Sequence, residues 1–194
     1  MQRLLKFGRA ELHRSGAIGF NVDRVVRQSK VSASSLYHHF GSRDGFLAAL
    51  EFERSFEEIM REMEMLNKYI TESDDPEALF KVTELVFSHS GNPTSQERRR
   101  HRIETLAAAS HNPGLRQMLA NAQQKGTARH IEVLQLAVMK SGAKLEQPIE
   151  GIAYLIQSLL IGRTLVDLMD DSDLSTAWEQ TALAALRGVL APIV

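Results

Sequence analysis

The sequence contains no cysteine among its 194 residues. Disulfide scaffolds, thiolate zinc sites and cysteine nucleophiles are therefore excluded, and the absence fits a reducing compartment. No apolar run approaches the roughly 20 residues that a membrane-spanning helix needs. Charged residues also occur throughout residues 1–20, where a signal peptide would need an apolar core. We therefore expect a cytoplasmic protein without a membrane segment.

Familiar catalytic patterns are also missing. The motifs G-x-S-x-G and G-x-G-x-x-G and the P-loop do not occur. No histidine has a glutamate three residues before it, as a di-iron carboxylate bundle would require. The adjacent His38 and His39 would point about 100° apart on a helix, and no third metal ligand lies near them in the sequence. We expect no enzymatic activity, no cofactor and no bound metal.

Charge is distributed unevenly along the chain, although the formal net charge is only −1. Residues 1–50 contain eight lysines or arginines and three acidic residues, so the rest of the chain has an excess of six acidic residues. A basic segment joined to a larger acidic one indicates that the basic segment binds a polyanion. Chance clustering on solvated helix faces is the alternative interpretation.

Hydrophobic spacing predicts helices and almost no strand, so the expected fold class is all-α. Leu5, Gly8 and Leu12 form one stripe of a first helix that stops near residues 15–16. Asn21 is a plausible N-cap for a second helix.

The segment VSASSLYHHFGSRDGFL, residues 31–47, contains the next signals. Ser32 can cap a third helix, residues 33–40, which Gly41 terminates. Ser42 can cap a fourth helix that runs from about residue 44 to about residue 68.

The second and third helices are short and are separated by a three-residue turn, which is the pattern of a helix-turn-helix. The third helix would turn Leu36 and Phe40 inward and expose short hydrogen-bond donors with a cation at either end. Such a surface suits a phosphate backbone and the edges of a groove. The residues on this face and beside it are Lys30, Ser34, Ser35, Tyr37, His38 and Arg43.

Residues 4–50 resemble the DNA-binding module of the TetR family of bacterial transcription regulators. The resemblance lies in VSASSLYHHFGSRDGFLAAL: a turn, a helix ending in Leu-Tyr-x-His-Phe, and Gly-Ser-basic-acidic at the start of the next helix. This sequence departs from the family at two positions. Lys30 replaces the usual turn glycine, and Glu11 stands where an apolar residue is usual, so the first helix is expected to pack less firmly.

The resemblance implies a role for individual residues. Tyr37 would bind a phosphate, His38 a phosphate or a base edge, and Ser34 and Ser35 would face the major groove. Arg43 would clamp the backbone at the start of the fourth helix. Asn21 and Ser32, which cap helices, would bring their side chains and backbone N–H groups to phosphates. A partly buried helix cap is the alternative for His38 and, more strongly, for His39.

The resemblance also implies a two-domain organisation: a helix-turn-helix DNA-binding domain, residues 1–48, and a helical effector-binding and dimerisation domain, residues 49–194. The segment 149–169 is apolar on nearly every side, so it needs cover from the core or from another subunit. With the last helix, about 175–190, it would form a homodimer interface; burial within the chain is the alternative. The run of arginines at residues 98–102 suggests a second nucleic-acid site, but a solvated helix face is the preferred interpretation.

The expected partners are a double-stranded operator with an inverted repeat, a second copy of the chain, and a small, mostly apolar effector that releases a repressor from DNA. Methionines and aromatic residues on the helices that line the family's pocket would form an adaptable cavity, although such residues are more often plain core. They are Phe56, Met60, Met63, Phe87, Met118, Tyr154 and Gln157. The alternative function is an all-helical carrier of small molecules that does not bind DNA.

Overall fold

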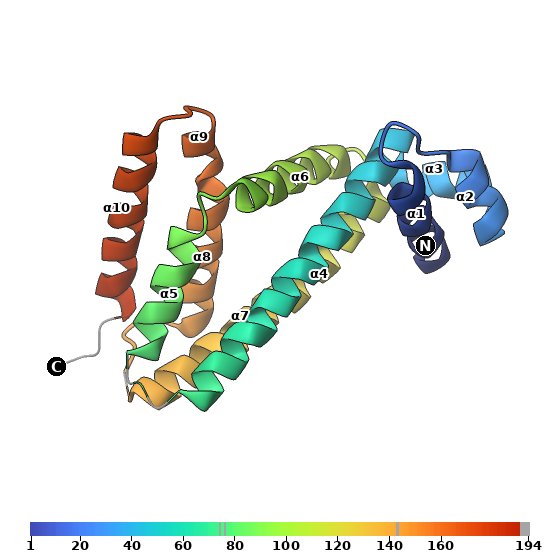
Figure 1. Ribbon diagram of the computed structural model, residues 1–194. Helices are drawn as coiled ribbons and strands as arrows, with labels where there is room; N and C mark the ends of the chain where they lie inside the picture. The colour runs from blue at the N-terminus through green and yellow to red at the C-terminus, as the bar shows by residue number, and fades with distance from the viewer. Residues whose placement is uncertain (74, 76, 143, 191–194) are drawn as a thin grey trace. The chain divides into compact units, whose positions relative to one another are not determined.

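The computed structural model describes residues 1–73, 75, 77–142 and 144–190. These residues form helices and no strand, which confirms the all-α prediction (Figure 1). The helices are α1 (Gln2–Ser15), α2 (Val22–Ser29), α3 (Ala33–Phe40), α4 (Arg43–Glu72), α5 (Ala78–Ser88), α6 (Pro93–Ala109), α7 (Pro113–Ser141), α8 (Ile149–Gly162), α9 (Thr164–Asp167) and α10 (Ser172–Leu190).

The chain forms two compact units, which are described separately. The first unit comprises residues 1–57 and 101–123, and the second comprises residues 58–100 and the described residues from 124 onward. Helices α4, α6 and α7 therefore contribute residues to both units. The sequence-based domain boundary after residue 48 stays a prediction.

The first unit has a core built from α1 to α4 together with the adjoining ends of α6 and α7. Phe40 and Phe46 lie side by side in it, with ring centroids 4.6 Å apart. Helix α1 approaches α4 closely at Gly8, where a Cβ atom would lie 2.6 Å from Cζ of Phe46. Leu5 and Gly8 of the predicted stripe are buried, and Leu12 is partly buried against the same core.

The helix boundaries in this unit follow the local signals in the sequence. The side chain of Asn21 accepts a hydrogen bond from Arg24 N (3.0 Å), and that of Ser32 accepts one from Ser35 N (3.1 Å). Gly41 has φ 75°, which favours glycine, and ends α3. These predicted caps are confirmed. Helix α4 is longer than expected, because it extends to Glu72 and not only to about residue 68.

The second unit has its own core, formed by the remaining parts of α4 and α7 together with α5, α8 and α10. The apolar residues of α10 mostly pack within this core, including Trp178, whose ring stacks on Phe87 at 5.8 Å. By contrast, three leucines in and near α8 and α9 are exposed: Leu155 of α8, Leu165 of α9 and Leu168, which follows α9.

One expectation about the second unit is wrong. Ile149–Asp167 is long and apolar enough to cross a membrane by length and composition, although the sequence was expected to contain no such stretch. Only 28% of this stretch is buried. A core helix of a soluble protein passes the same test, so the finding chiefly shows how much apolar surface α8 and α9 leave uncovered within one chain.

Candidate nucleic-acid interface

Helices α2 and α3 form the helix-turn-helix, and buried side chains fix the turn between them. Val25 and Leu36 are buried on the two helices, and Val31 in the turn is partly buried against the same core. Ser29, which sequence reasoning missed, is fully buried at the end of α2. Its hydroxyl donates to Val26 O (3.2 Å) and accepts from Val31 N (3.3 Å), so it fixes the geometry of the turn.

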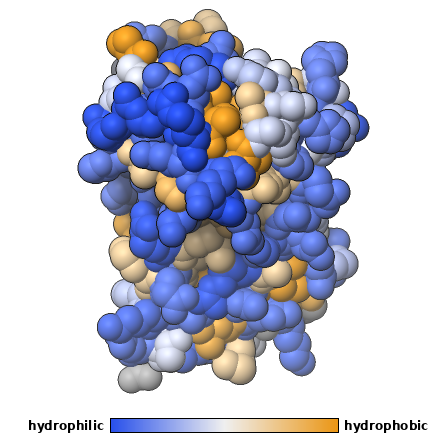
Figure 2. Space-filling view, turned by 90° about the vertical axis from the view of Figure 1, so that its right-hand side faces the viewer, coloured by the Kyte–Doolittle hydropathy of each residue, from blue (hydrophilic) through white to orange (hydrophobic). Residues whose placement is uncertain are grey.

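Helix α3 presents the polar face that its sequence predicts. Ser34, Tyr37 and His38 are exposed, and Ser35 is partly exposed beside the cap. His39 is only partly exposed, and burial lowers the pKa of its imidazole. His38 is thus the histidine that remains available on the outer face. The surface on the side of α1 to α3 is mostly hydrophilic, with small separate apolar areas (Figure 2).

The two predicted phosphate-binding cations lie in different surroundings. Lys30 is exposed and has left-handed backbone angles, φ 53° and ψ 34°, which are unusual for a residue with a Cβ atom. Arg43 is partly buried, because one guanidinium nitrogen donates to Ala17 O (2.6 Å) and another lies 3.3 Å from Asp44. Arg43 therefore ties the loop after α1 to the start of α4, besides offering a charge to a ligand.

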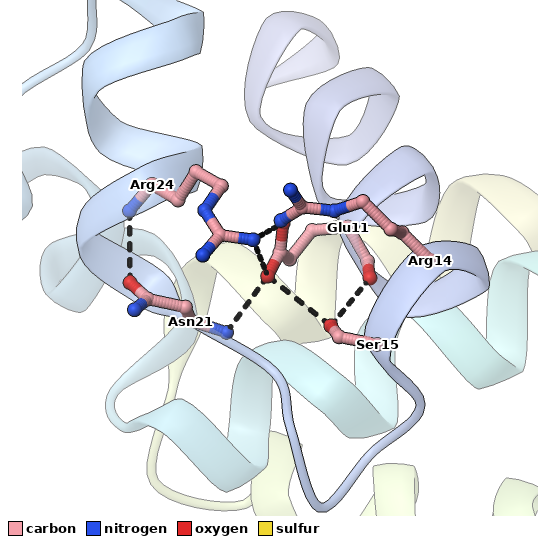
Figure 3. A network of polar contacts seen from close by, with 5 residues as sticks. All are labelled: Glu11, Arg14, Ser15, Asn21 and Arg24. Atoms are coloured by element: carbon pink, nitrogen blue, oxygen red, sulfur yellow. Dashed lines mark hydrogen bonds and ion pairs between the residues drawn. The ribbon is translucent and has the colours of Figure 1, made fainter.

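Glu11 corrects an expectation about α1. Its side chain is only 1% exposed, yet the helix packs firmly because hydrogen bonds surround the carboxylate (Figure 3). Arg14 donates to it, the hydroxyl of Ser15 donates at 3.1 Å, and the backbone N–H of Asn21 donates at 3.2 Å. Arg24 of α2 lies 3.4 Å away.

This network joins α1 to the first turn of α2. The hydrogen bond from Arg14 is the main reason that the pKa of Glu11 is lower than the ordinary value of 4.5. Glu11 thus fixes the position of Asn21, which the resemblance places at the DNA backbone, although Glu11 itself is buried. Sequence reasoning had no signal for this role.

The arginine run on α6 does not form a solvated face, and that preferred interpretation is wrong. Arg98 donates to Glu58 (3.2 Å) and Glu62 (2.8 Å) of α4. Arg99 is buried and donates to Asp167 at 2.7 Å. Arg102 is partly buried and donates to Gln123. These contacts within the chain also leave little support for a second nucleic-acid site.

The residues predicted to line an effector pocket lie in varied surroundings. Phe87 is fully buried, and Tyr154 is 52% exposed. Gln157 lies 3.3 Å from Thr127 and from His130, whose pKa burial lowers to about 4. The ring of Phe56 stacks on Phe52. Three methionines are partly buried: Met60, Met63 and Met118. Their role in binding an effector stays a prediction.

Comparison with known proteins agrees with this geometry. Residues 4–50 match the family model described as bacterial regulatory proteins, tetR family. No curated protein matches the chain.

Solved structures share the fold over nearly the whole chain. The TetR-family transcriptional regulator from Cytophaga hutchinsonii has a TM-score of 0.59 and 14% identity, with 99% of this chain and 95% of that chain covered. A TetR transcription regulator from Haloarcula marismortui has a TM-score of 0.57 and 16% identity, with 97% of each chain covered. The regulator FadR from Bacillus subtilis, solved in complex with stearoyl-CoA, has a TM-score of 0.50 and 17% identity, with 100% and 99% covered.

The matched segment contains α2, α3 and their turn, which together form the polar, cation-flanked face described above. Regulators of this family are not enzymes. The matched segment, residues 4–50, therefore resembles the tetR family of bacterial regulatory proteins, and the chain as a whole shares the fold of solved regulators of that family.

Proposed function

We propose that the protein is a cytoplasmic, dimeric repressor that binds an inverted-repeat operator when empty and leaves it when a small, mostly apolar effector binds. The observation that carries the DNA-binding part is the exposed face of α3, where Ser34, Tyr37 and His38 stand between Lys30 and Arg43. Short hydroxyl donors and cations hold phosphates, while a helix of this size fits the major groove. Two such helices in a dimer would contact half-sites about 34 Å apart, one helical turn.

The contacts carried over from the family remain part of this proposal. Asn21 and Ser32 begin α2 and α3, so their exposed side chains lie beside the free N–H groups of each first turn. Helix N-termini of this kind favour phosphate oxygens.

The dimer is proposed through α8 and α9, with α10 beside them. The uncovered apolar stretch Ile149–Asp167 supports this, since a second copy would cover it with the same surface. Burial within the chain, the alternative, does not account for the exposed Leu165 and Leu168.

The effector response is proposed to involve α4, which begins beside α3 and contributes residues to both units. An effector that binds more tightly to the DNA-free state must lose affinity when DNA binds, by the same factor that DNA loses. Replacing the partly buried Met60 with tryptophan would mimic an occupied site. We expect M60W to bind DNA less tightly than wild type without an effector; wild-type affinity in a folded variant would refute transmission through α4.

DNA binding is tested with the full-length chain. Fragments selected from a genomic library by the protein would be sequenced, and the enriched site would then be used in fluorescence anisotropy. A carrier protein would enrich no fragment, which would favour the alternative function. An enriched site without an inverted repeat would refute two-fold operator recognition.

A matched pair of tyrosine variants tests the position of the interface. Tyr37 is 45% exposed on α3, and Tyr69 is 48% exposed on α4. Tyr37→Phe should weaken binding of the dimer by about a hundredfold, because it removes two hydrogen bonds to charged phosphates, each of which contributes roughly 1.5 kcal/mol. Tyr69→Phe should leave affinity unchanged. Equal affinities of the two variants would show that α3 does not face DNA in this way.

A further inference from the structure

A cavity of about 330 Å³ lies within the first unit, lined by α4, α6 and α7. Phe52, Leu106 and Leu119 form most of its apolar wall. The volume is at the small end of the range of about 300–1,000 Å³ for ligand sites. None of the residues predicted from the sequence to bind an effector lines this cavity.

One wall of the cavity carries a cation, Arg102, that forms no ion pair within the described part of the chain. Arg102 of α6 donates to Gln123 of α7, but its Nε is buried and has no hydrogen-bond partner among the residues that the structure describes. Burial is also what lowers the pKa of Arg102, with no neighbouring carboxylate acting against it. A buried cation without a partner is costly, and an anion that accepts its hydrogen bonds removes that cost.

A second arginine lies at the same cavity. Arg116 of α7 is exposed, and it donates to the backbone carbonyl of Ser110 at 2.8 Å. This hydrogen bond links the first turn of α7 to the residue that follows α6, and so holds the α6–α7 connection. The site thus combines an apolar wall with two guanidinium groups, one partly buried and one exposed.

We propose that this cavity binds an amphipathic anion: an apolar chain or ring of about ten non-hydrogen atoms that ends in a single carboxylate. The carboxylate would accept hydrogen bonds from Arg102, and the apolar part would lie against Phe52, Leu106 and Leu119. The inference rests on the proposed function and deepens it, since it gives the chemical class of the effector.

The same cavity adjoins the segment that packs on the end of the DNA-reading helix. A Cβ atom at Gly114 would lie 2.9 Å from the carbonyl oxygen of His39, so this approach requires glycine. Asn112 caps α7 at Leu115 N, and its Nδ2 would lie 3.1 Å from a Cβ atom at Gly41. If Arg116 also donates to the carboxylate that Arg102 holds, its hydrogen bond to Ser110 O is lost and this segment beside α3 loosens. Binding would thereby change the support of α3 from within its own unit.

The test is isothermal titration calorimetry of the full-length protein, without DNA, with three probes of equal length: octanoate, octan-1-ol and octylammonium. We expect saturable binding of one octanoate per chain, at least tenfold tighter than octan-1-ol, and no binding of octylammonium. Arg102→Gln should abolish the preference for octanoate over the alcohol. Arg61→Gln, which removes an exposed arginine of α4 elsewhere, should keep it.

A second variant covers the case in which Arg102→Gln does not fold. Ala120 lines the cavity and is exposed, so Ala120→Phe would fill the space without removing a core side chain. It should weaken octanoate binding at least tenfold while the charge stays constant. The proposal is overturned if octanoate does not bind, if the alcohol binds as tightly, or if both variants bind octanoate as wild type does.

A DNA-binding measurement with octanoate distinguishes failure of this proposal from failure of the proposed function. Octanoate at saturating concentration should lower affinity for the selected DNA site in wild type and leave it unchanged in Arg102→Gln. Saturable, Arg102-dependent binding in a protein that does not bind DNA would uphold the site and refute repression. Octanoate-insensitive DNA binding without any calorimetric binding would uphold the regulator and refute the site.

Discussion

The turn of the helix-turn-helix contains a residue for which fold stability and DNA affinity make opposite demands. Lys30 has φ 53° and ψ 34°, a left-handed conformation that costs a residue with a Cβ atom about 1–2 kcal/mol. Glycine avoids this cost but loses roughly 0.5–1 kcal/mol more backbone entropy on folding. Lys30→Gly should therefore stabilise the protein by about 0.5–1 kcal/mol.

The control is Lys30→Ala, which removes the same charge but keeps the Cβ atom. It should be as stable as wild type, so the two variants separate backbone strain from electrostatics. For a chain of this length, 1 kcal/mol corresponds to about 2–4 °C in Tm. Thermal unfolding should be followed by circular dichroism at one protein concentration, because dimer stability depends on concentration. A Lys30→Gly variant no more stable than Lys30→Ala would refute the strain argument.

DNA binding should respond to the charge alone. Each phosphate contact that is lost reduces the slope of log affinity against log salt concentration by about 0.9. In a dimer each Lys30 variant removes two such contacts, so both variants should lose about 1.8 from the slope on every DNA sequence, although only one of them gains stability. An unchanged slope in both variants would show that Lys30 does not contact phosphate.

Three further perturbations test other parts of the molecule. Arg43→Ala should also reduce the salt slope by about 1.8, since a dimer loses two phosphate contacts, whereas Arg61→Ala should not. The pKa of Glu11 is lowered in the folded chain, so the carboxylate's contribution to stability is present above pH 4.5 and is lost as the pH falls through the folded pKa. In Glu11→Gln, the free energy of unfolding measured with urea should therefore depend less steeply on pH in the acid range. Leu168→Glu should shift the mass from light scattering from twice 21.7 kDa to the single-chain mass. Ile18→Glu, on an apolar residue that is even more exposed but lies in the first unit, should leave the dimer intact. A monomeric wild type at micromolar concentration would contradict the dimer.

The helix-turn-helix could be predicted from the sequence because its signals are local. Asn21 and Ser32 each accept a hydrogen bond from a backbone N–H three residues later, and Gly41 ends α3 by its own backbone angles. A short window of sequence contains both partners of each such interaction. The exposed face of α3 follows as soon as Leu36 and Phe40 are assigned to the core.

Glu11 shows where that reasoning stops. An acidic residue where the family usually has an apolar one suggested looser packing. Arg14 and Ser15 lie three and four residues later on the same helix, but its other partners are distant in the sequence. The backbone N–H of Asn21 and the guanidinium of Arg24 lie 10 and 13 residues away, on the far side of a loop. Only the packing of α1 against α2 brings these two groups to the carboxylate, where they add to the hydrogen bonds from Arg14 and Ser15 and complete the network around the buried charge.

The arginines of α6 also have partners that are distant in the sequence, and these partners determine the role of each arginine. Arg98 pairs with Glu62, 36 residues earlier, and Arg99 pairs with Asp167, 68 residues later. No helical window contains both members of either pair, so a run of arginines looks solvated, or looks like a nucleic-acid site, whatever its real partners are. Arg102 differs from both, since its Nε is buried and no carboxylate among the described residues pairs with it. A cation that the fold has largely withdrawn from water without pairing it has an electrostatic reason to bind an anion, and this distinguishes Arg102 from its paired neighbours more sharply than sequence position does.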